Sequence, residues 1–167
     1  MGKLYLPNIL KIQIKLQPHE IKRDINIILL QKLKQTIGNK CSREGYIDKK
    51  SIKILRRTLG NINSLSLDGS VLYNIQYFAE VCYPLEGTEL NVEVISKNKL
   101  GLLCKLHPLS IVIPKQSHSD IEIKQLIEDC EKGDKIDIKI IGSRFKKDSK
   151  EIFVIGEFIK KNNNLIK

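Results

Sequence analysis

The chain has 167 residues, a mass of 19.1 kDa and a mean hydropathy of -0.20, which fits one medium globular domain or two small ones. Its longest apolar run, residues 25–30, is far shorter than the roughly 20 residues of a membrane span, and no secretory signal opens the sequence, so we expect neither a membrane nor a secreted protein. The net charge of +10 is uneven, because residues 1–83 carry 14 basic and 6 acidic side chains (+8) and residues 84–167 carry 15 and 13 (+2). This charge favours nucleic acid, an acidic membrane or an acidic protein surface as a partner, with plain solubility as the alternative.

The first predicted element is a strand over residues 4–16. Apolar and polar residues alternate strictly at its end, where Ile12, Ile14 and Leu16 share one face, as in a half-buried strand. Pro18 cannot donate a backbone hydrogen bond to a sheet, so the strand should end before it.

The next predicted element is a helix over residues 20–36. Its stripe has the spacing of a helix packed on a sheet and comprises Ile21, Ile25, Ile28, Leu29, Lys32 and Leu33. Gly38 is a suitable stop for this helix. Three short strands, a loop and a long strand should follow, at residues 40–42, 46–47, 51–55, 60–69 and 71–81. Residues 1–83 are thus predicted to form a small α+β domain.

The second predicted domain covers residues 84–167 and begins at the Pro84–Gly87 turn. Its strand-like runs are residues 89–96, 100–106, 109–114, 135–141 and 152–159. A helix is expected at residues 119–131, between the third and fourth strands. Five strands with a helix after the third is the order of an OB-fold barrel.

The sequence offers little catalytic chemistry. It contains none of the common nucleotide-binding, nucleophile or metalloprotease motifs. The four cysteines, Cys41, Cys82, Cys104 and Cys130, form no C-x-x-C pair, so we expect reduced, mostly buried thiols and no zinc site. His107 and His118 lie near Cys104 in sequence but complete no ligand set. We therefore predict no catalysis by the chain alone, no metal and no cofactor.

A basic cluster with an aromatic residue marks the connection between the last two predicted strands. It consists of Arg144, Phe145, Lys146, Lys147 and Lys150. A ring for base stacking beside cations for phosphates is typical of single-stranded RNA binding, although exposed hairpin tips often look the same. Phe153 and Phe158 lie in an apolar strand and are expected to face the core. With one candidate ring, RNA binding should be weak.

The order of several short motifs carries a resemblance to a known family. These motifs are Leu16-Gln17-Pro18, Gly38-Asn39-Lys40-Cys41, Gly45-Tyr46-Ile47, a loop that runs from Gly60 to Asp68-Gly69, a tyrosine-rich strand from Tyr73 to Tyr83, Pro84-Leu85-Glu86-Gly87, Gly101-Leu102 and His107-Pro108-Leu109. In this order they resemble the seventh-subunit family of DNA-directed RNA polymerases, called E-prime in archaea, the larger member of the polymerase stalk. The sequence from Leu16 to Glu20 is similar to that of the family members encoded by large cytoplasmic DNA viruses. The family's aromatic residue beside Gly101 is absent here, which argues against strong RNA binding.

The resemblance implies a noncatalytic polymerase subunit with two domains. The first, an antiparallel sheet with one packed helix, would be the tip domain that docks at the clamp base of the large subunits, beside a small sixth-subunit-like chain. The second would be an S1-like OB-fold barrel near the RNA exit. The docking loop would comprise Gly60, Asn61, Ile62, Asn63, Leu65, Leu67, Asp68 and Gly69, with its three apolar residues as anchors.

The resemblance has further implications for partners and location. Stalk members usually pair with a fourth-subunit homologue, and nascent RNA would be a weak ligand. A viral version would occupy the virion and the host cytoplasm, and a cellular one the nucleus. The main alternative is a free-standing S1/OB-fold RNA-binding protein, and a lesser one is an enzyme with a dispersed active site.

Overall fold

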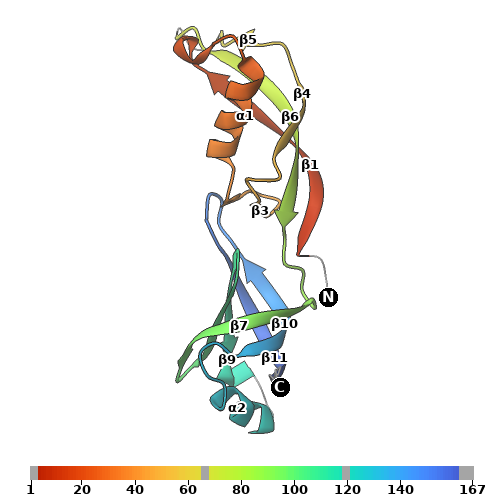
Figure 1. Ribbon diagram of the computed structural model, residues 1–167, viewed down its shortest axis with the longest axis vertical. Coiled ribbons are helices and arrows are strands. Elements are labelled where there is room, and N and C mark those ends of the chain that lie inside the picture. The colour runs from red at the N-terminus through yellow and green to blue at the C-terminus, as the bar shows by residue number, and fades with distance from the viewer. Residues whose placement is uncertain (1–3, 65–67, 118–120, 162–167) are drawn as a thin grey trace, which may run out of the picture. The chain divides into compact units, whose positions relative to one another are not determined.

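The computed structural model describes residues 4–64, 68–117 and 121–161. The chain divides into two compact units (Figure 1). One unit spans Tyr5–Cys82 and contains an antiparallel sheet with a helix. The other contains the residues from Tyr83 onward, together with Leu4, and forms a closed barrel. The α+β class is therefore confirmed.

The sheet is built on one long antiparallel pair. Strand β1 (Tyr5–Leu16) runs beside β6 (Val71–Cys82) along its whole length, with Tyr5 opposite Cys82 and Leu16 opposite Val71. The other side of β6 pairs in succession with three short strands, β5 (Asn61–Ile62), β4 (Lys53–Arg57) and β3 (Tyr46–Ile47), and β3 in turn pairs with β2 (Lys40–Cys41). The loop predicted at residues 60–69 thus contains a short strand.

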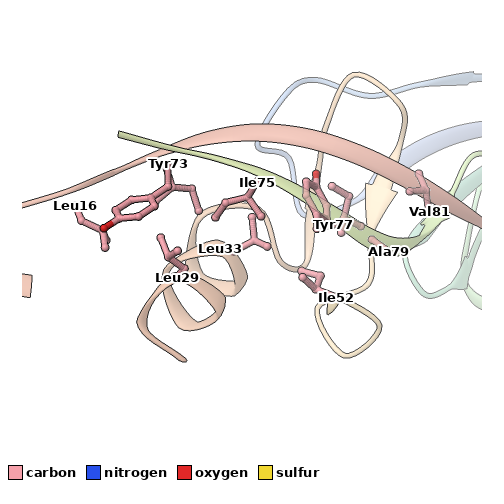
Figure 2. Close-up of a cluster of buried hydrophobic side chains, with 11 residues drawn as sticks. Leu16, Leu29, Leu33, Ile52, Tyr73, Ile75, Tyr77, Ala79 and Val81 are labelled. Carbon is pink, nitrogen blue, oxygen red and sulfur yellow. The ribbon is translucent and has the colours of Figure 1, made fainter. Parts of the chain in front are cut away.

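Helix α1 (Ile25–Thr36) packs on this sheet through Leu29 and Leu33, both fully buried. Figure 2 shows these two side chains facing Tyr73 and Ile75 of β6, as the predicted stripe and strand face require. Burial of each such side chain contributes about 1.5–3 kcal/mol relative to an exposed position. The buried members of this core are Ile14, Leu16, Leu29, Leu33, Ile47, Ile52, Tyr73, Ile75, Tyr77, Ala79 and Val81.

The prediction that α1 begins at residue 20 was wrong. A separate 3-10 turn, η1 (Pro18–Glu20), precedes the helix, which begins at Ile25. The Glu20 carboxylate accepts the backbone N–H of Gln17 at 2.8 Å and pairs with Lys32 Nζ at 2.5 Å. These contacts hold the turn against α1, and residues 21–24, which connect the two, are not helical.

The far end of α1 also differs in detail. The left-handed residue after the helix is Asn39, with φ 56°, rather than Gly38. Gly38 is required for a different reason, because a Cβ at this position would collide with the carbonyl oxygen of Lys34.

The second unit is a five-stranded barrel. Its strands are β7 (Glu89–Asn98), β8 (Gly101–Leu106), β9 (Leu109–Pro114), β10 (Lys135–Arg144) and β11 (Ile152–Lys161). The spatial order is β7-β8-β9-β11-β10, and β10 pairs with β7 to close the barrel. The β9–β11 pair is parallel and the others are antiparallel. This is an OB-like arrangement, and the predicted order of five strands is confirmed.

The connection between β9 and β10 contains the 3-10 turn η2 (Lys115–Ser117) and helix α2 (Ile121–Glu128). The helix predicted over residues 119–131 ends earlier than expected, at Glu128, and residues 119 and 120 lie outside the described part of the chain. Ile127 of α2 and Cys130, which follows it, are both buried. Inside the barrel, strand residues alternate between core and surface, as in the run from Ile136 to Ile140.

Candidate functional site

The end of the β10–β11 hairpin carries the predicted RNA-binding residues. The strand register places Arg144, the last residue of β10, opposite Phe153 near the start of β11. Ile152 and Val154 point into the barrel, so Phe153 points outward, with 58% of its surface exposed. The expectation that Phe153 faces the core was wrong, whereas Phe158 is buried as expected.

Phe145 is less available than Phe153. Its side chain is half-buried, and its ring lies edge-to-face against Tyr83, with 5.9 Å between centroids and an interplanar angle of 89°. Such aromatic pairs stabilise a fold by about 0.5–1.5 kcal/mol beyond the burial of surface. Phe145 therefore packs against Tyr83 within the fold. Phe153 is the more exposed ring, and the sequence analysis did not select it as a candidate for base stacking.

A hollow of about 400 Å³ lies beside these two rings. Its lining consists of Arg144, Phe145, Lys146, Lys147, Asp148, Ser149 and Phe153. The structure thus brings together four of the five predicted residues, and Lys150 lies on the same connection outside the lining. The hollow falls within the usual size range of small-ligand sites, ~300–1,000 Å³.

The charge at this hairpin is positive. Arg144, Lys146, Lys147 and Lys150 are exposed, and none of them forms an ion pair with a carboxylate in the described part of the chain. Glu151 is paired with Lys105, with 2.8 Å between Nζ and Oε1, so it does not offset these cations. An exposed ring beside unpaired cations can stack a base and neutralise phosphates.

The predicted docking loop is partly visible. Ile62 lies in β5 and has 76% of its surface exposed, as an anchor for a partner would require. Leu59, which the sequence analysis did not select, is 85% exposed just before the loop. Leu65 and Leu67 lie outside the described residues. Exposed aliphatic side chains in this segment are compatible with docking.

Several polar residues of the same loop have a structural role. Asp68 forms an ion pair with Lys15 of β1 at 2.6 Å and accepts hydrogen bonds from the backbone and hydroxyl of Ser70 at 3.1 and 2.7 Å. Asn63 donates its backbone N–H to the Ser70 carbonyl at 2.8 Å. Gly69 has φ 65°, a conformation that glycine adopts without strain. These contacts close the loop on the long β1–β6 pair. Gly60 and Asn61 are exposed, and Asn61 pairs with Leu72 of β6.

The cysteines behave as core residues. All four are buried and none forms a disulfide, as predicted. Burial raises the pKa of Cys82 and that of Cys104 to about 12, so the reactive thiolate is scarce at neutral pH. Within residues 4–64, 68–117 and 121–161, no three His, Cys, Asp or Glu side chains gather as a metal site would require, and His118 lies outside these ranges. In the same ranges no helix has the length and apolarity to cross a bilayer.

Comparisons with known proteins point to one kind of complex. No family profile matches the chain. A putative DNA-directed RNA polymerase subunit, L376, of Acanthamoeba polyphaga mimivirus is 21% identical over 165 residues, which cover 93% of this chain and 82% of the relative. The DNA-directed RNA polymerase II subunit RPB7 of Glycine max is 26% identical over 168 residues, which cover 89% of this chain and 88% of the relative. These two relatives confirm the resemblance seen in the sequence: over most of its length, the chain is similar to the seventh subunit of DNA-directed RNA polymerases.

Proposed function

We propose that the chain is a noncatalytic stalk subunit of a multisubunit DNA-directed RNA polymerase that acts during transcription. The observation that carries this proposal is that the similarity to two polymerase subunits extends over both compact units rather than over the OB-like barrel alone. A barrel shared with many RNA-binding proteins would not account for the matching sheet unit. A viral form would act in the cytoplasm of the infected cell and enter the virion.

The sheet unit is the proposed tip domain, which docks at the base of the polymerase clamp. The supporting features are Ile62 and Leu59, whose aliphatic side chains are mostly exposed, and the contacts of Asp68 that hold the loop on β1. Burial of such anchors in partner pockets supplies most of the energy of an interface. The large subunits and a small sixth-subunit-like chain would form the receiving surface, and a fourth-subunit-like chain would complete the stalk.

The barrel is the proposed S1-like domain, and its β10–β11 hairpin would contact nascent RNA. Phe153 would supply the stacking surface, and Arg144, Lys146, Lys147 and Lys150 would approach the phosphates. With so small an aromatic platform the affinity should be of the order of the non-specific range, ~10⁻⁴–10⁻⁶ M. RNA contact is thus secondary to attachment to the polymerase.

Affinity purification of the tagged chain followed by mass spectrometry tests this function. A polymerase subunit should co-purify with the two largest polymerase chains in a salt-resistant complex. The rival, a free-standing S1/OB-fold RNA-binding protein, should instead recover RNA and lose it as salt rises, because each neutralised phosphate releases counterions. Recovery of RNA without large polymerase chains would overturn the proposal.

A further inference from the structure

A groove between α1 and β4 lies beside the docking segment, with which it shares Leu59, and its other lining residues belong to neither of the surfaces described above. Its volume is about 840 Å³. One wall consists of residues of α1 between Asn26 and Lys34. The other wall consists of residues in the segment from Lys50 to Leu59. Arg57 joins the two walls, since its Nε donates a hydrogen bond to Asn26 Oδ1 at 2.6 Å.

The groove is lined in part by aliphatic side chains that are exposed rather than buried in the core. Ile27 of α1 is 56% exposed, although Leu29 and Leu33 of the same helix are fully buried in the core. Across the groove, Leu55 is about half exposed and Leu59 is almost entirely exposed. Aliphatic surface concentrated in one hollow is typical of an interaction site.

The groove is also strongly basic. Five of its lining residues are cations, namely Lys34, Lys50, Lys53, Arg56 and Arg57, and none is acidic. Only the Arg57 side chain has described partners, which are Asn26, the Thr58 carbonyl and the ring of Tyr73. The other four cations form no ion pair with any carboxylate that the structure describes. The resulting potential attracts an anionic partner.

The backbone of β4 provides a third recognition element. Among the described strands, β4 pairs with β6 alone, so its other edge faces no strand. An unpaired strand edge presents N–H and C=O groups to which an extended peptide can add. The phosphates of a nucleic acid would also be attracted to these cations. However, the lining contains no aromatic side chain on which a base could stack.

We propose that this groove binds an extended acidic segment of a partner protein. The carboxylates of that segment face Lys34, Lys53 and Arg56, and its apolar side chains pack on the exposed aliphatic residues. Its backbone runs along the free edge of β4. This site adjoins the docking loop, with which it shares Leu59, and it is distinct from the hairpin to which the RNA contact is assigned.

Fluorescence anisotropy with the full-length chain tests the proposal. The probe is a fluorescein-labelled peptide in which Glu and Leu alternate. Reversing two groove charges in the Lys53→Glu/Arg56→Glu variant should weaken binding about tenfold, because two attractions become repulsions. The matched control is Lys22→Glu/Arg23→Glu, which makes the same change in net charge at exposed positions of the same unit and should keep the parent affinity. Ile27→Ser, at a groove residue outside the docking segment, should weaken binding without any change in charge, and circular dichroism verifies that each variant is folded.

Four outcomes would overturn the proposal. They are no binding of the Glu-Leu peptide, equal loss in the two charge-reversal variants, equal affinity for a polyglutamate peptide without Leu, and tighter binding of labelled oligouridylate that Lys53→Glu/Arg56→Glu abolishes. The last outcome would make the groove a nucleic-acid site. Since the assay uses the purified chain and a synthetic probe, its result is independent of co-purification with a polymerase.

Discussion

Arg144 and Phe153 occupy opposing positions of the β10–β11 pair, and both lie on the exposed side of the barrel wall. Side chains at such directly opposed positions have Cβ atoms about 4.5–5.5 Å apart. A guanidinium and a phenyl ring at that separation can contact the same base, one by cation–π attraction and the other by stacking. This pair, rather than Phe145 alone, defines the candidate RNA contact.

The two rings of the hairpin should therefore respond differently to truncation. Phe153→Ala should weaken binding of labelled oligouridylate by ~1–3 kcal/mol, which is about 5- to 150-fold, with little change in melting temperature. Phe145→Ala should lower the melting temperature, because its contact with Tyr83 is lost. Anisotropy titrations and thermal denaturation of both variants give the comparison. If Phe145→Ala abolished binding and Phe153→Ala did not, the assignment of the stacking ring would be wrong.

The cations of the hairpin supply the salt-dependent part of RNA binding. The variant Arg144→Ser/Lys146→Ser/Lys147→Ser should lose crosslinking to nascent RNA. Its affinity for RNA should also depend less steeply on salt concentration. Its attachment to the polymerase should be unchanged, since docking is assigned to the other unit. Crosslinking at the parent level in this variant would contradict the proposed RNA contact.

The docking loop can be tested through its exposed anchors. Replacing Leu59 and Ile62 together by Ser should release the chain from the polymerase, because each loss of a well-packed anchor typically costs an interface about 2 kcal/mol or more. The fold should persist, since both side chains are exposed. Co-purification is measured beside circular dichroism, with exposed Leu100→Ser in the barrel unit as the control. Retained polymerase in the loop variant would remove these residues from the interface.

The turn before α1 predicts a pH-dependent contribution to stability. The hydrogen bond from the backbone N–H of Gln17 holds the pKa of the Glu20 carboxyl below its usual range, and the contact with Lys32 adds to this effect. A depressed pKa stabilises the fold above the unfolded-state pKa, and this contribution is lost as pH falls through the folded-state value. Glu20→Gln should thus lower the free energy of unfolding by up to about 1 kcal/mol at neutral pH, with solvent screening included. Urea titrations at neutral pH and at progressively lower pH should show this difference shrinking as the pH falls below the usual glutamate range. A difference that stays constant with pH would contradict the ionic origin.

The two faces of α1 predict opposite sensitivities. Leu33→Ala should lower the free energy of unfolding by about 2–5 kcal/mol, because Leu33 is fully buried and its truncation leaves a cavity. Ile27→Ala on the same helix should change it by less than about 0.5 kcal/mol, since this side chain is mostly exposed. Equal losses in the two variants, measured by urea denaturation, would contradict the orientation of the helix.

The buried thiols give a chemical readout of folding. Because burial raises the pKa of Cys82 and that of Cys104 to about 12, their alkylation by iodoacetamide near pH 8 should be slow in the native protein and fast in urea. Mass spectrometry of the alkylated chain identifies the sites. Rapid native alkylation of either cysteine would contradict its burial.

Local pattern was sufficient for much of the fold. Period-two alternation in β1 and β6, and the run of five strands with one helix after the third, could be predicted because each signal depends on neighbours in sequence. The burial of the cysteines followed from composition and spacing in the same way. The positive hairpin could also be located, because its cations are adjacent along the chain.

The tertiary structure decided what depends on contacts between distant residues. The run from Ile152 to Ile155 is apolar throughout, so its sequence could not show that Phe153 faces outward, and only the pairing of β11 with β9 and β10 determines this. The Glu20–Lys32 contact joins the turn η1 to α1 across residues that are distant in sequence, and the basic groove exists only because α1 packs beside β4. Sequence periodicity reports which residues share a face, whereas the packing of elements determines which faces remain exposed and adjacent.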